Sequence, residues 1–560
     1  MKSTFLSGFL FLLLSFSLPG QSPFTSTSNP NAVATFECAG IYWQTPEAGI
    51  CSVRYKKSNS SAWQNGLDLV FDSRNGEYRG SLINLTPASN YIVELSAGKT
   101  KVQLKFTTRN DDFPTGKKTV IQPGESDKTI TITESGTPEA YHLVTAPDGN
   151  KSVINLKNVY DNGIIVDADY VIVRGIEIRN ARVNGILIRK ERHDVVVDRC
   201  FITFWGRIGG PVTYGNFEGN MDSGIYGETG TWNLTLQRNL IEDPRGASND
   251  WETGHPAGPQ GISIIQSKGG NVIRYNDIIS TEDHGFNDGI GGSANFSDVG
   301  NVNRDSDVYG NIINNSWDNP IEVEGANMNV RVWGNYIDQY YSGIATASTN
   351  RGPIYIYRNI MARSRRGHRN DAGGMFIKTG DKQGFGGGKR MVFHNTILQP
   401  GGAMNIIGDD PNIYSRNNVF DVPGSVGPNN EKEALSDFDY DFYTGSKGIA
   451  KEEHGITGRW SKFLYVRTHN LQFYPKSTVS RVVIGKFPTQ FGDRTVTITD
   501  PVLQVKSPLI DSGFVLKGFN EDFKGSAPDI GAFEVGNPPL EFGRRAYLRY
   551  NEGLAPWEEY

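Results

Sequence analysis

The residues best suited to chemistry in this 560-residue chain are Glu322 and Glu324, two positions apart. They belong to the segment Pro-Ile-Glu-Val-Glu, residues 320–324, in which apolar and acidic residues alternate. This alternation is typical of a β-strand, so both glutamates share one face and lie about 6.6–6.8 Å apart along it. Two carboxyls at this separation raise the pKa of one of them, so one can donate a proton while the other stays ionised. Hydrolysis of a glycosidic bond requires that division of roles.

Further acidic residues surround this pair in the sequence. Residues 281–289 read Thr-Glu-Asp-His-Gly-Phe-Asn-Asp-Gly, and Asp318 stands in the turn before the glutamates. A histidine in such a turn can be a general base, a ligand or an ordinary turn residue. The glutamates, for their part, could be solvated strand residues without a catalytic role. We predict that the catalytic residues are Glu322, Glu324, Asp288, His284 and Asp283, and we expect no metal site.

Basic and aromatic residues could hold the substrate. The run Arg-Ser-Arg-Arg-Gly-His-Arg, residues 363–369, suits sulfate or carboxylate groups, although a charge run is often only a solvated face. The insertion Trp-Glu-Thr-Gly-His-Pro, residues 251–256, is long enough to form a wall, and its tryptophan could stack on a sugar ring. The predicted substrate-binding residues are Lys378, Arg351, Arg363, Arg365, Arg366, His368, Tyr226, Glu228, Trp251 and His255.

An internal repeat must position these residues. An asparagine recurs in an apolar-x-x-Asn-x-apolar element at Asn239, Asn276, Asn311, Asn335, Asn359, Asn395 and Asn418. The unit is about 24 residues long, with insertions of about 12 residues in some copies. A strand-rich unit of this length cannot bury its apolar face alone, so successive units should stack as a parallel solenoid. We interpret the asparagines as structural, each bonded to the turns above and below.

A second strand of each repeat mostly reads Gly-Ile-x-apolar. The residues one and three after the glycine should point inward, and those two and four after it outward. With Gly374 aligned to Gly343, Lys378 takes the same outward position as Glu324. The outward positions hold Tyr226, Glu228, Ser263, Ser293, Glu322, Glu324 and Lys378. One row of strands is therefore predicted to carry the chemistry on its outer face.

The repeat over residues 118–426 resembles the right-handed parallel β-helix of polysaccharide-degrading enzymes. These include fucan-degrading hydrolases, polygalacturonases, pectate lyases and chondroitinase-B-like lyases. The lysine and arginine signature of the chondroitinase-B-like family is not found. The resemblance implies an all-β protein with a right-handed parallel β-helix acting on a polysaccharide.

The N-terminal part has the pattern of a β-sandwich. Short strand-like runs alternate with turns over residues 33–109. The segment Leu-Thr-Pro-Ala-Ser-Asn-Tyr, residues 85–91, resembles the tyrosine corner of a fibronectin type III domain, and Trp43 and Tyr55 stand where core aromatics of that family would lie. Such a domain implies a spacer or an accessory to carbohydrate binding. Cys38 and Cys51 could form a disulfide within it.

The predicted organisation has four parts. Residues 1–20 have the charged start and apolar run of a secretory signal peptide. A fibronectin type III-like β-sandwich follows at 21–110, the catalytic β-helix at 111–426, and a segment that closes and caps the β-helix at 427–560. A net charge of -5 argues against a nucleic-acid partner. We expect a secreted monomer with no membrane partner.

Three functions remain open from the sequence. The first is hydrolysis of an anionic, sulfated polysaccharide, for example an algal fucan, by the carboxyl groups. The second is a lyase that cleaves a uronate polymer by β-elimination, with a base such as Lys378. No cofactor is expected for hydrolysis, whereas a lyase could use Ca²⁺ held by acidic residues. The third is a β-helix that binds glycans without catalysis.

Overall fold

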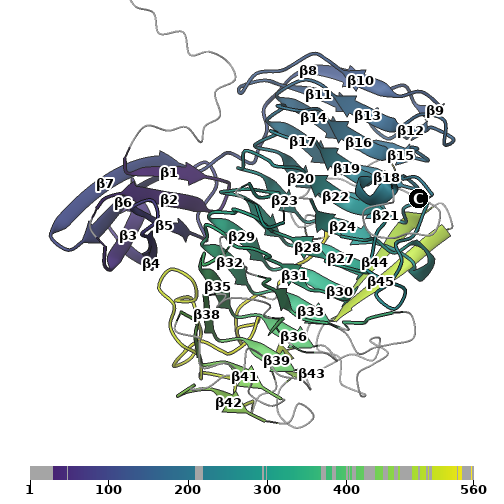
Figure 1. Ribbon diagram of the computed structural model, residues 1–560. Helices are drawn as coiled ribbons and strands as arrows, with labels where there is room; N and C mark the ends of the chain where they lie inside the picture. The colour runs from purple at the N-terminus through teal and green to yellow at the C-terminus, as the bar shows by residue number, and fades with distance from the viewer. Residues whose placement is uncertain are drawn as a thin grey trace, which may run out of the picture.

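The computed structural model contains two β-rich units, an N-terminal sandwich and a long solenoid, which lie side by side (Figure 1). The structure describes residues 29–46, 48–208, 218–292, 295–297, 299–362, 364–367, 374–380, 386–398, 402, 404–405, 412–421, 435–444, 452–458, 465–466, 482–489, 492–499, 502–503, 507–538, 540–544, 546 and 557. The proposed signal peptide lies outside these residues, so secretion stays a prediction. Within them, no helix is both long and apolar enough to cross a membrane.

The N-terminal unit is an antiparallel sandwich of seven strands. In spatial order these are β1 (Asn31–Ala34), β2 (Ala39–Gln44), β5 (Glu77–Leu82), β4 (Gln64–Asp72), β3 (Cys51–Lys57), β6 (Asn90–Ala97) and β7 (Thr100–Thr107). Trp43 and Tyr55 lie in its core, as predicted. The backbone N–H of Thr86 donates to the Tyr91 hydroxyl at 2.9 Å, which is the expected tyrosine-corner contact. Cys38 and Cys51 are buried free thiols, so the possible disulfide is not formed.

The second unit is a right-handed parallel β-helix of three sheets, which confirms the predicted fold. The sheet of ten contains β10 (Ile130–Ile132), β13 (Asn162–Val166), β16 (Asn184–Ile188), β19 (Ser223–Gly227), β22 (Gln260–Ile264), β25 (Ile290–Gly291), β28 (Ile321–Glu322), β31 (Ile344–Ala345), β34 (Ile377–Lys378) and β37 (Met404–Asn405). The sheet of twelve contains β8 (Thr115–Val120), β11 (Tyr141–Thr145), β14 (Val171–Arg174), β17 (Val195–Asp198), β20 (Thr235–Gln237), β23 (Val272–Arg274), β26 (Asp307–Tyr309), β29 (Val330–Trp333), β32 (Ile354–Tyr357), β35 (Arg390–Phe393), β38 (Ile413–Arg416) and β40 (Asp437–Asp439). The sheet of thirteen contains β9 (Gly124–Ser126), β12 (Ser152–Asn155), β15 (Glu177–Arg179), β18 (Phe201–Thr203), β21 (Leu240–Glu242), β24 (Asp277–Ile279), β27 (Ile312–Ser316), β30 (Tyr336–Tyr340), β33 (Ile360–Ala362), β36 (Thr396–Leu398), β39 (Val419–Asp421), β41 (Phe442–Tyr443) and β42 (Ile456–Thr457).

Short elements complete the described chain. Two 3-10 turns, η2 (Glu218–Met221) and η3 (Glu282–His284), stand in loops that lead into the sheet of ten. Two small antiparallel pairs follow the β-helix, namely β43 (Tyr465–Val466) with β46 (Val502–Leu503), and β44 (Val482–Thr489) with β45 (Gly492–Thr499). Described residues of the segment 507–546 contact the side of the β-helix, where Ala532 N donates to Thr396 Oγ1 at 2.9 Å. Closure of the solenoid end by this segment stays a prediction.

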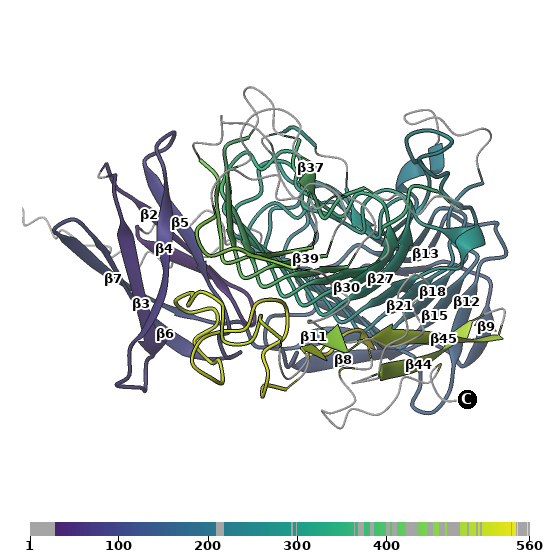
Figure 2. The same cartoon turned by 90° about the horizontal axis from the view of Figure 1, so that it is seen from below.

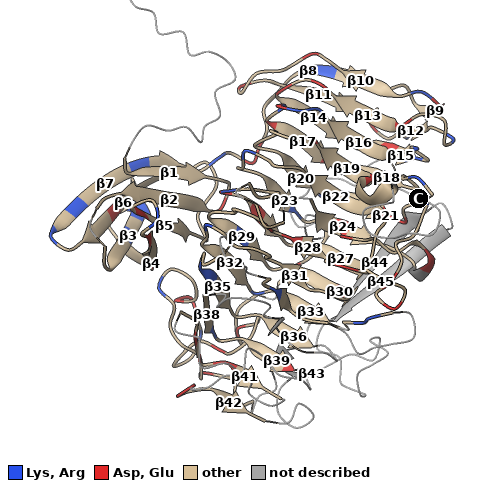
Figure 3. Cartoon of the chain, viewed as in Figure 1, with Lys and Arg blue, Asp and Glu red and all other residues tan. Residues whose placement is uncertain are grey.

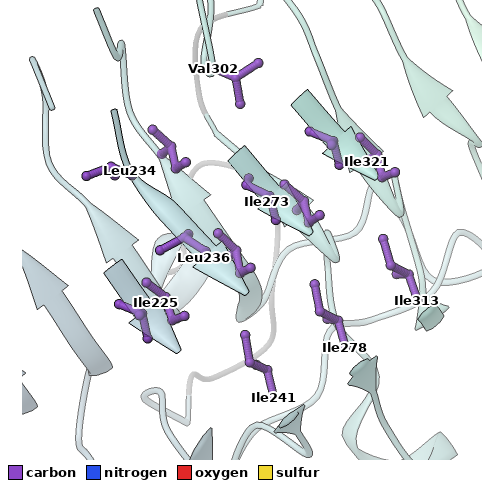
Figure 4. Packing of buried hydrophobic residues seen from close by; sticks show 14 of the residues in the cluster. Ile225, Leu234, Leu236, Ile241, Ile273, Ile278, Val302, Ile313 and Ile321 are labelled. Carbon is purple, nitrogen blue, oxygen red and sulfur yellow. The ribbon is translucent and has the colours of Figure 1, made fainter. Parts of the chain in front are cut away.

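Columns of isoleucine form the core of the sheet of ten. Strand pairing stacks Ile262, Ile290, Ile321 and Ile344 in register, and all four are buried. Figure 4 shows Ile321 among the buried side chains that fill the solenoid. These residues occupy the position directly after the glycine of the repeat, or after Pro320, so the predicted inward position is confirmed. Residues on either side of each isoleucine in a strand must then face outward.

A ladder of buried asparagines links the coils at another corner. The side-chain amide of Asn335 donates to Asn359 Oδ1 at 3.0 Å and to the Val308 carbonyl at 3.0 Å. Its own oxygen accepts from Asn311 Nδ2 at 2.9 Å. The same pattern repeats at the neighbouring coils, so the asparagines are structural, as predicted.

Asn335→Ala is expected to lower the thermal midpoint of unfolding by several degrees. The substitution removes one rung and leaves the buried partners on Asn311 and Asn359 unpaired, which costs about 1–3 kcal/mol per group. Asn59→Ala, at an exposed turn of the sandwich, is the matched control and should leave the midpoint unchanged. Equal midpoints for the two variants would contradict the structural role of the ladder.

The sandwich packs firmly on the sheet of twelve. Tyr355 in β32 accepts a hydrogen bond from Ser81 N at 2.8 Å, and Arg79 Nε donates to the Gly352 carbonyl at 3.0 Å. The Tyr42 hydroxyl donates to the Asp305 carboxylate at 2.9 Å. These contacts come from β2 and β5, so this half of the sandwich is covered by the β-helix. Strands β3 and β7 lie on the side away from it (Figure 2).

Candidate functional site

The outer face of the sheet of ten brings together the two central glutamates. Ile321 and Val323 lie in the core, so Glu322 and Glu324 point outward, as predicted. Both are nevertheless almost inaccessible, with exposures of 6% and 0%. Glu322 Oε2 accepts a hydrogen bond from Gly292 N at 3.1 Å, and Glu324 Oε1 accepts one from Ala347 N at 3.3 Å. Backbone groups of the adjacent coils therefore fix both carboxyls.

Two aspartates at the starts of neighbouring strands complete a group of four carboxyls. Asp288 is 3% exposed, and its Oδ1 accepts a hydrogen bond from Asn319 N at 3.0 Å. Asp318, the residue before Asn319, is 4% exposed. Gly291 leaves space for this arrangement, because a Cβ there would lie 2.9 Å from the Cβ of Asp288. We call Asp288, Asp318, Glu322 and Glu324 the carboxyl cluster.

Lys378 enters the carboxyl cluster from two coils away. Lys378 in β34 pairs with Ala345, and Ala345 pairs with Glu322. The small side chain of Ala345 allows Lys378 Nζ to reach Glu324 Oε1 at 3.2 Å. The same nitrogen donates to Asn319 Oδ1 at 3.3 Å. Lys378 is therefore ion-paired with one carboxyl of the group.

The register corrects one detail of the sequence alignment. We expected Lys378 to occupy the position of Glu324, but the pairing places it in the row of Glu322. Ile377 pairs with Ile344, so Gly374 is not the counterpart of Gly343. A long loop precedes β34 and hides the true start of the strand. The error is two residues, so the predicted outward direction of Lys378 was unaffected.

The carboxyl cluster is electrostatically strained by its burial. Burial raises the pKa of Glu322 well above its usual range, and repulsion from Asp288 and Glu324 adds to the rise. Burial and repulsion from Asp318 do the same to the pKa of Asp288. Burial also raises the pKa of Glu324, but Lys378 opposes this rise through its charge and its hydrogen bond. Burial and repulsion therefore favour a proton on Glu322 or Asp288, whereas Lys378 makes Glu324 the most readily ionised of these three carboxyls.

Lys378 is held as a cation. Burial alone would lower its pKa, but the nearby carboxylates, first of all Glu324, outweigh that effect and raise it. The ammonium group therefore neutralises part of the carboxyl cluster and is poorly suited to accept a proton.

His284 and Asp283 lie at the other end of the loop that carries Asp288. His284 stands in η3, where its Nδ1 lies 2.8 Å from the Pro244 carbonyl oxygen and its ring packs beside Phe204. Asp283 is exposed in the same turn. The loop is long enough to separate its two ends, a feature that residue spacing did not reveal. A catalytic role for either residue stays a prediction.

The insertion at 251–256 reaches the carboxyl cluster. His255 Nε2 lies 3.8 Å from Asp318 Oδ2. The Trp251 ring packs against His255, with 4.6 Å between centroids, and against Tyr341 at 5.0 Å. His255 therefore borders the cluster and Trp251 packs against His255, whereas contact of either residue with a substrate stays a prediction.

Tyr226 and Glu228 lie farther along the sheet of ten. Tyr226 is half-buried and stands in the same column as Glu322, three strands towards the N-terminus. Glu228 forms an ion pair with Arg189 at 3.1 Å. Contact of Tyr226 and Glu228 with a substrate stays a prediction.

The predicted arginines have different settings. Arg365 is 5% exposed, lies 4.3 Å from the centroid of Trp317, and donates to Asn315 Oδ1 at 2.6 Å. These contacts hold the Arg365 side chain inside the protein, whereas Arg366 is exposed. The carbonyl of Arg351 accepts from Arg79 at the sandwich interface. Arg363 and His368 lie outside the described residues.

Asn319 is a site residue that the sequence reasoning missed. Its backbone binds Asp288, its side-chain oxygen binds Lys378, and its Nδ2 donates to the Ser342 carbonyl at 2.7 Å. Its place directly before Pro320 matches that of Asp288 before Gly289, which was the available signal. As for metals, no group of three or more His, Cys, Asp or Glu side chains among the described residues is arranged to hold an ion.

Comparisons with known proteins give distant structural neighbours. No protein-family model matches the chain, and no curated protein matches it in sequence. The pectate lyase Pel9A is similar over 76% of this chain and 91% of its own, with 14% identity and a TM-score of 0.41. The PL6 family alginate lyase AlyGC is similar over 77% of this chain and 57% of its own, with 9% identity and a TM-score of 0.40. The fold assignment rests on the strand pairing of the chain itself.

Proposed function

We propose that the protein hydrolyses a polysaccharide at the carboxyl cluster. One observation carries this proposal, namely that within the described part of the chain four buried carboxyls gather around Lys378, which is ion-paired with Glu324. The carboxyls therefore have unequal environments, as acid and base catalysis requires. An ordinary solvated strand would not bury these groups together, because burial of unpaired carboxyls costs free energy.

The environments suggest how the roles are divided. Glu322, whose pKa is raised by burial and by Asp288, donates a proton to the oxygen of the glycosidic bond. Glu324, held by Lys378 and Ala347 N, acts as the carboxylate that activates water or attacks the sugar. Asp288 and Asp318 maintain the negative surroundings that keep the proton on Glu322. Asn319 positions both Asp288 and Lys378.

Elimination is less well supported by the same contacts. A lyase needs a base that is unprotonated at the working pH, and Lys378 was the candidate. The carboxylates around Lys378 raise its pKa and keep its ammonium group charged. Hydrolysis uses the carboxyl cluster in the protonation states that its environment favours.

We further propose that the substrate is an anionic polymer, such as a sulfated fucan. The outer face of the β-helix is extended, and Tyr226 lies about 14 Å from Glu322 along the same column, which several sugar units would span. The exposed Arg366 belongs to the arginine run that suits sulfate groups. An uncharged part of the sugar would bind at the carboxyl cluster itself.

A panel of sulfated, uronate and neutral polysaccharides tests this function. Reducing ends and the absorbance of unsaturated products are recorded together. We expect reducing ends without that absorbance, from a sulfated polymer. Reducing ends with the absorbance would establish elimination instead. If no polymer is cleaved, the hydrolase proposal fails and glycan binding without catalysis becomes the leading function.

A further inference from the structure

The exposed face of the sandwich carries an unusual group of basic side chains. On β3, β6 and β7 the residues opposite the core form three cross-strand rows, Ser52–Ser96–Lys101, Arg54–Glu94–Gln103 and Lys56–Ile92–Lys105. Val53, Tyr55 and Leu95 alternate with them and are buried in the core, which fixes the outward direction of the rows. We call these nine residues together with Trp63 the basic face. Figure 3 shows blue segments on β7, the strand that carries Lys101 and Lys105.

The charge of the basic face contrasts with that of the whole chain. Four basic residues stand there beside one described acid, Glu94, in a chain with a net charge of -5. Glu94 pairs with Arg54 at 2.8 Å and with Lys101 at 3.3 Å. Lys56 and Lys105 share the third row, where Ile92 stands between them. That row is consequently positive and partly apolar.

An aromatic ring lies beside these cations. Trp63 precedes β4 and is partly exposed. The Arg54 guanidinium lies 4.5 Å from the centroid of its ring, and Lys56 Nζ lies 5.2 Å from it. Arginine forks and ammonium groups bind sulfate and carboxylate, and a tryptophan ring offers a flat apolar surface to a sugar ring. An anionic sugar presents both of these chemical features.

The contacts of the described residues place the sandwich with this face uncovered by the β-helix. The opposite half, with β2 and β5, is covered by the sheet of twelve through Tyr42, Arg79 and Ser81. Strands β3, β6 and β7, which carry the basic face, lie on the side of the sandwich away from the β-helix (Figure 2). The hydrogen bonds between the two units would keep a ligand on this face close to the β-helix.

We propose that the basic face is a second binding site for anionic polysaccharide, separate from the carboxyl cluster. It binds a remote part of the polymer and raises the local concentration of cleavable bonds at the cluster. The choice of ligand rests on the proposed function, but the binding itself does not need cleavage. A purely structural spacer would have no need for a tryptophan between cations on its exposed face.

Binding is tested in the full chain carrying Glu322→Gln, so that no turnover interferes. The probes are dextran sulfate and unmodified dextran, which share a backbone and differ in charge. We expect binding to dextran sulfate alone. Trp63→Ala and the double variant Lys56→Ala/Lys105→Ala should each weaken it at least about fivefold, because each removes an interaction worth about 1 kcal/mol. The control Lys128→Ala/Lys157→Ala removes two exposed lysines of the β-helix and should bind normally.

The outcomes separate this proposal from the proposed function. Circular dichroism and the thermal midpoint confirm that each variant is folded. Two results would overturn the basic face as an anionic site. One is a face variant that binds dextran sulfate as tightly as the control does, and the other is equal binding of dextran and dextran sulfate. Weakened binding together with a chain that cleaves no polymer would retain the basic face and reject the hydrolase. In the active chain, which retains Glu322, the face variants should raise KM for a cleaved polymer and leave kcat for short oligosaccharides unchanged.

Discussion

Glu322→Gln is expected to lower kcat/KM by about a thousandfold and, at the same time, to raise the thermal midpoint. Proton donation by a positioned carboxyl contributes about 10²–10⁴-fold to catalysis. Glutamine has nearly the same shape and keeps an oxygen for Gly292 N, but it cannot donate that proton. It also removes a carboxyl whose ionisation is opposed by burial and by Asp288 and Glu324. Glu322 therefore contributes to catalysis and, at the same time, lowers the stability of the folded protein.

The gain in thermal midpoint from Glu322→Gln should increase as the pH rises. The folded-state pKa of Glu322 lies above that of the unfolded chain, so the folded state binds the proton more tightly. This contribution is complete below the unfolded pKa, about 4.3 for glutamate, and is lost as pH rises through the folded pKa. Glutamine does not titrate, so the variant should exceed the wild type by more at pH 8 than at pH 5.

Thermal midpoints at the two pH values, with activity on the cleaved polymer, measure both effects. Glu125→Gln, at an exposed position of β9, is the matched control and should change neither quantity. A Glu322→Gln protein with wild-type turnover would remove Glu322 from the mechanism. A lower midpoint at pH 8 would show that the carboxyl cluster is stabilising as it stands.

Lys378→Met should have the second largest effect, with the opposite sign on stability. The ammonium group offsets the burial of Glu324, which has no exposure. Its removal leaves a buried carboxylate without a cation, so we expect a loss of about 2 kcal/mol at neutral pH. This is below the 3–5 kcal/mol typical of fully buried pairs, because the lysine side chain is 23% exposed. The loss should shrink as pH falls and Glu324 becomes protonated.

The activity of the Lys378→Met variant should fall together with its stability, because Glu324 would no longer stay ionised. We expect kcat/KM to drop about a hundredfold, with the remaining activity shifted to higher pH. Lys378→Arg keeps the charge and serves as the control, with a smaller loss in both activity and midpoint. The two variants are compared by pH–rate profiles and by thermal midpoints at pH 5 and pH 8. Identical behaviour of the methionine and arginine variants would contradict the role of the ion pair.

The parts of the fold that repeat were predictable from the sequence. An isoleucine recurs after the glycine of the repeat because every coil must fill the same core. An asparagine recurs in the ladder because every coil must satisfy the same buried amides. The outward direction of Glu322 and Glu324 follows from Ile321 by alternation. The tyrosine corner was predictable as well, because Thr86 and Tyr91 are close in sequence.

The remaining features depend on loops and on contacts between distant residues. The path of the loop places Asp288 in the carboxyl cluster and His284 beside the Pro244 carbonyl. Residue types alone do not reveal that path. The near-complete burial of Glu324 arises from neighbouring coils that alternation cannot reveal. The docking of the sandwich joins Tyr42 to Asp305, residues that only the folded chain brings together.

The most direct test of the central claim is cleavage of the polymer in water enriched in ¹⁸O, with mass spectrometry of the products as soon as they form. Hydrolysis at the carboxyl cluster predicts that wild-type products gain one ¹⁸O at the new reducing end, and that Glu322→Gln forms the same labelled product about a thousandfold more slowly. Products that lack the label and carry a double bond would show that the bond is broken by elimination. That result would contradict the roles assigned here to Glu322 and Glu324.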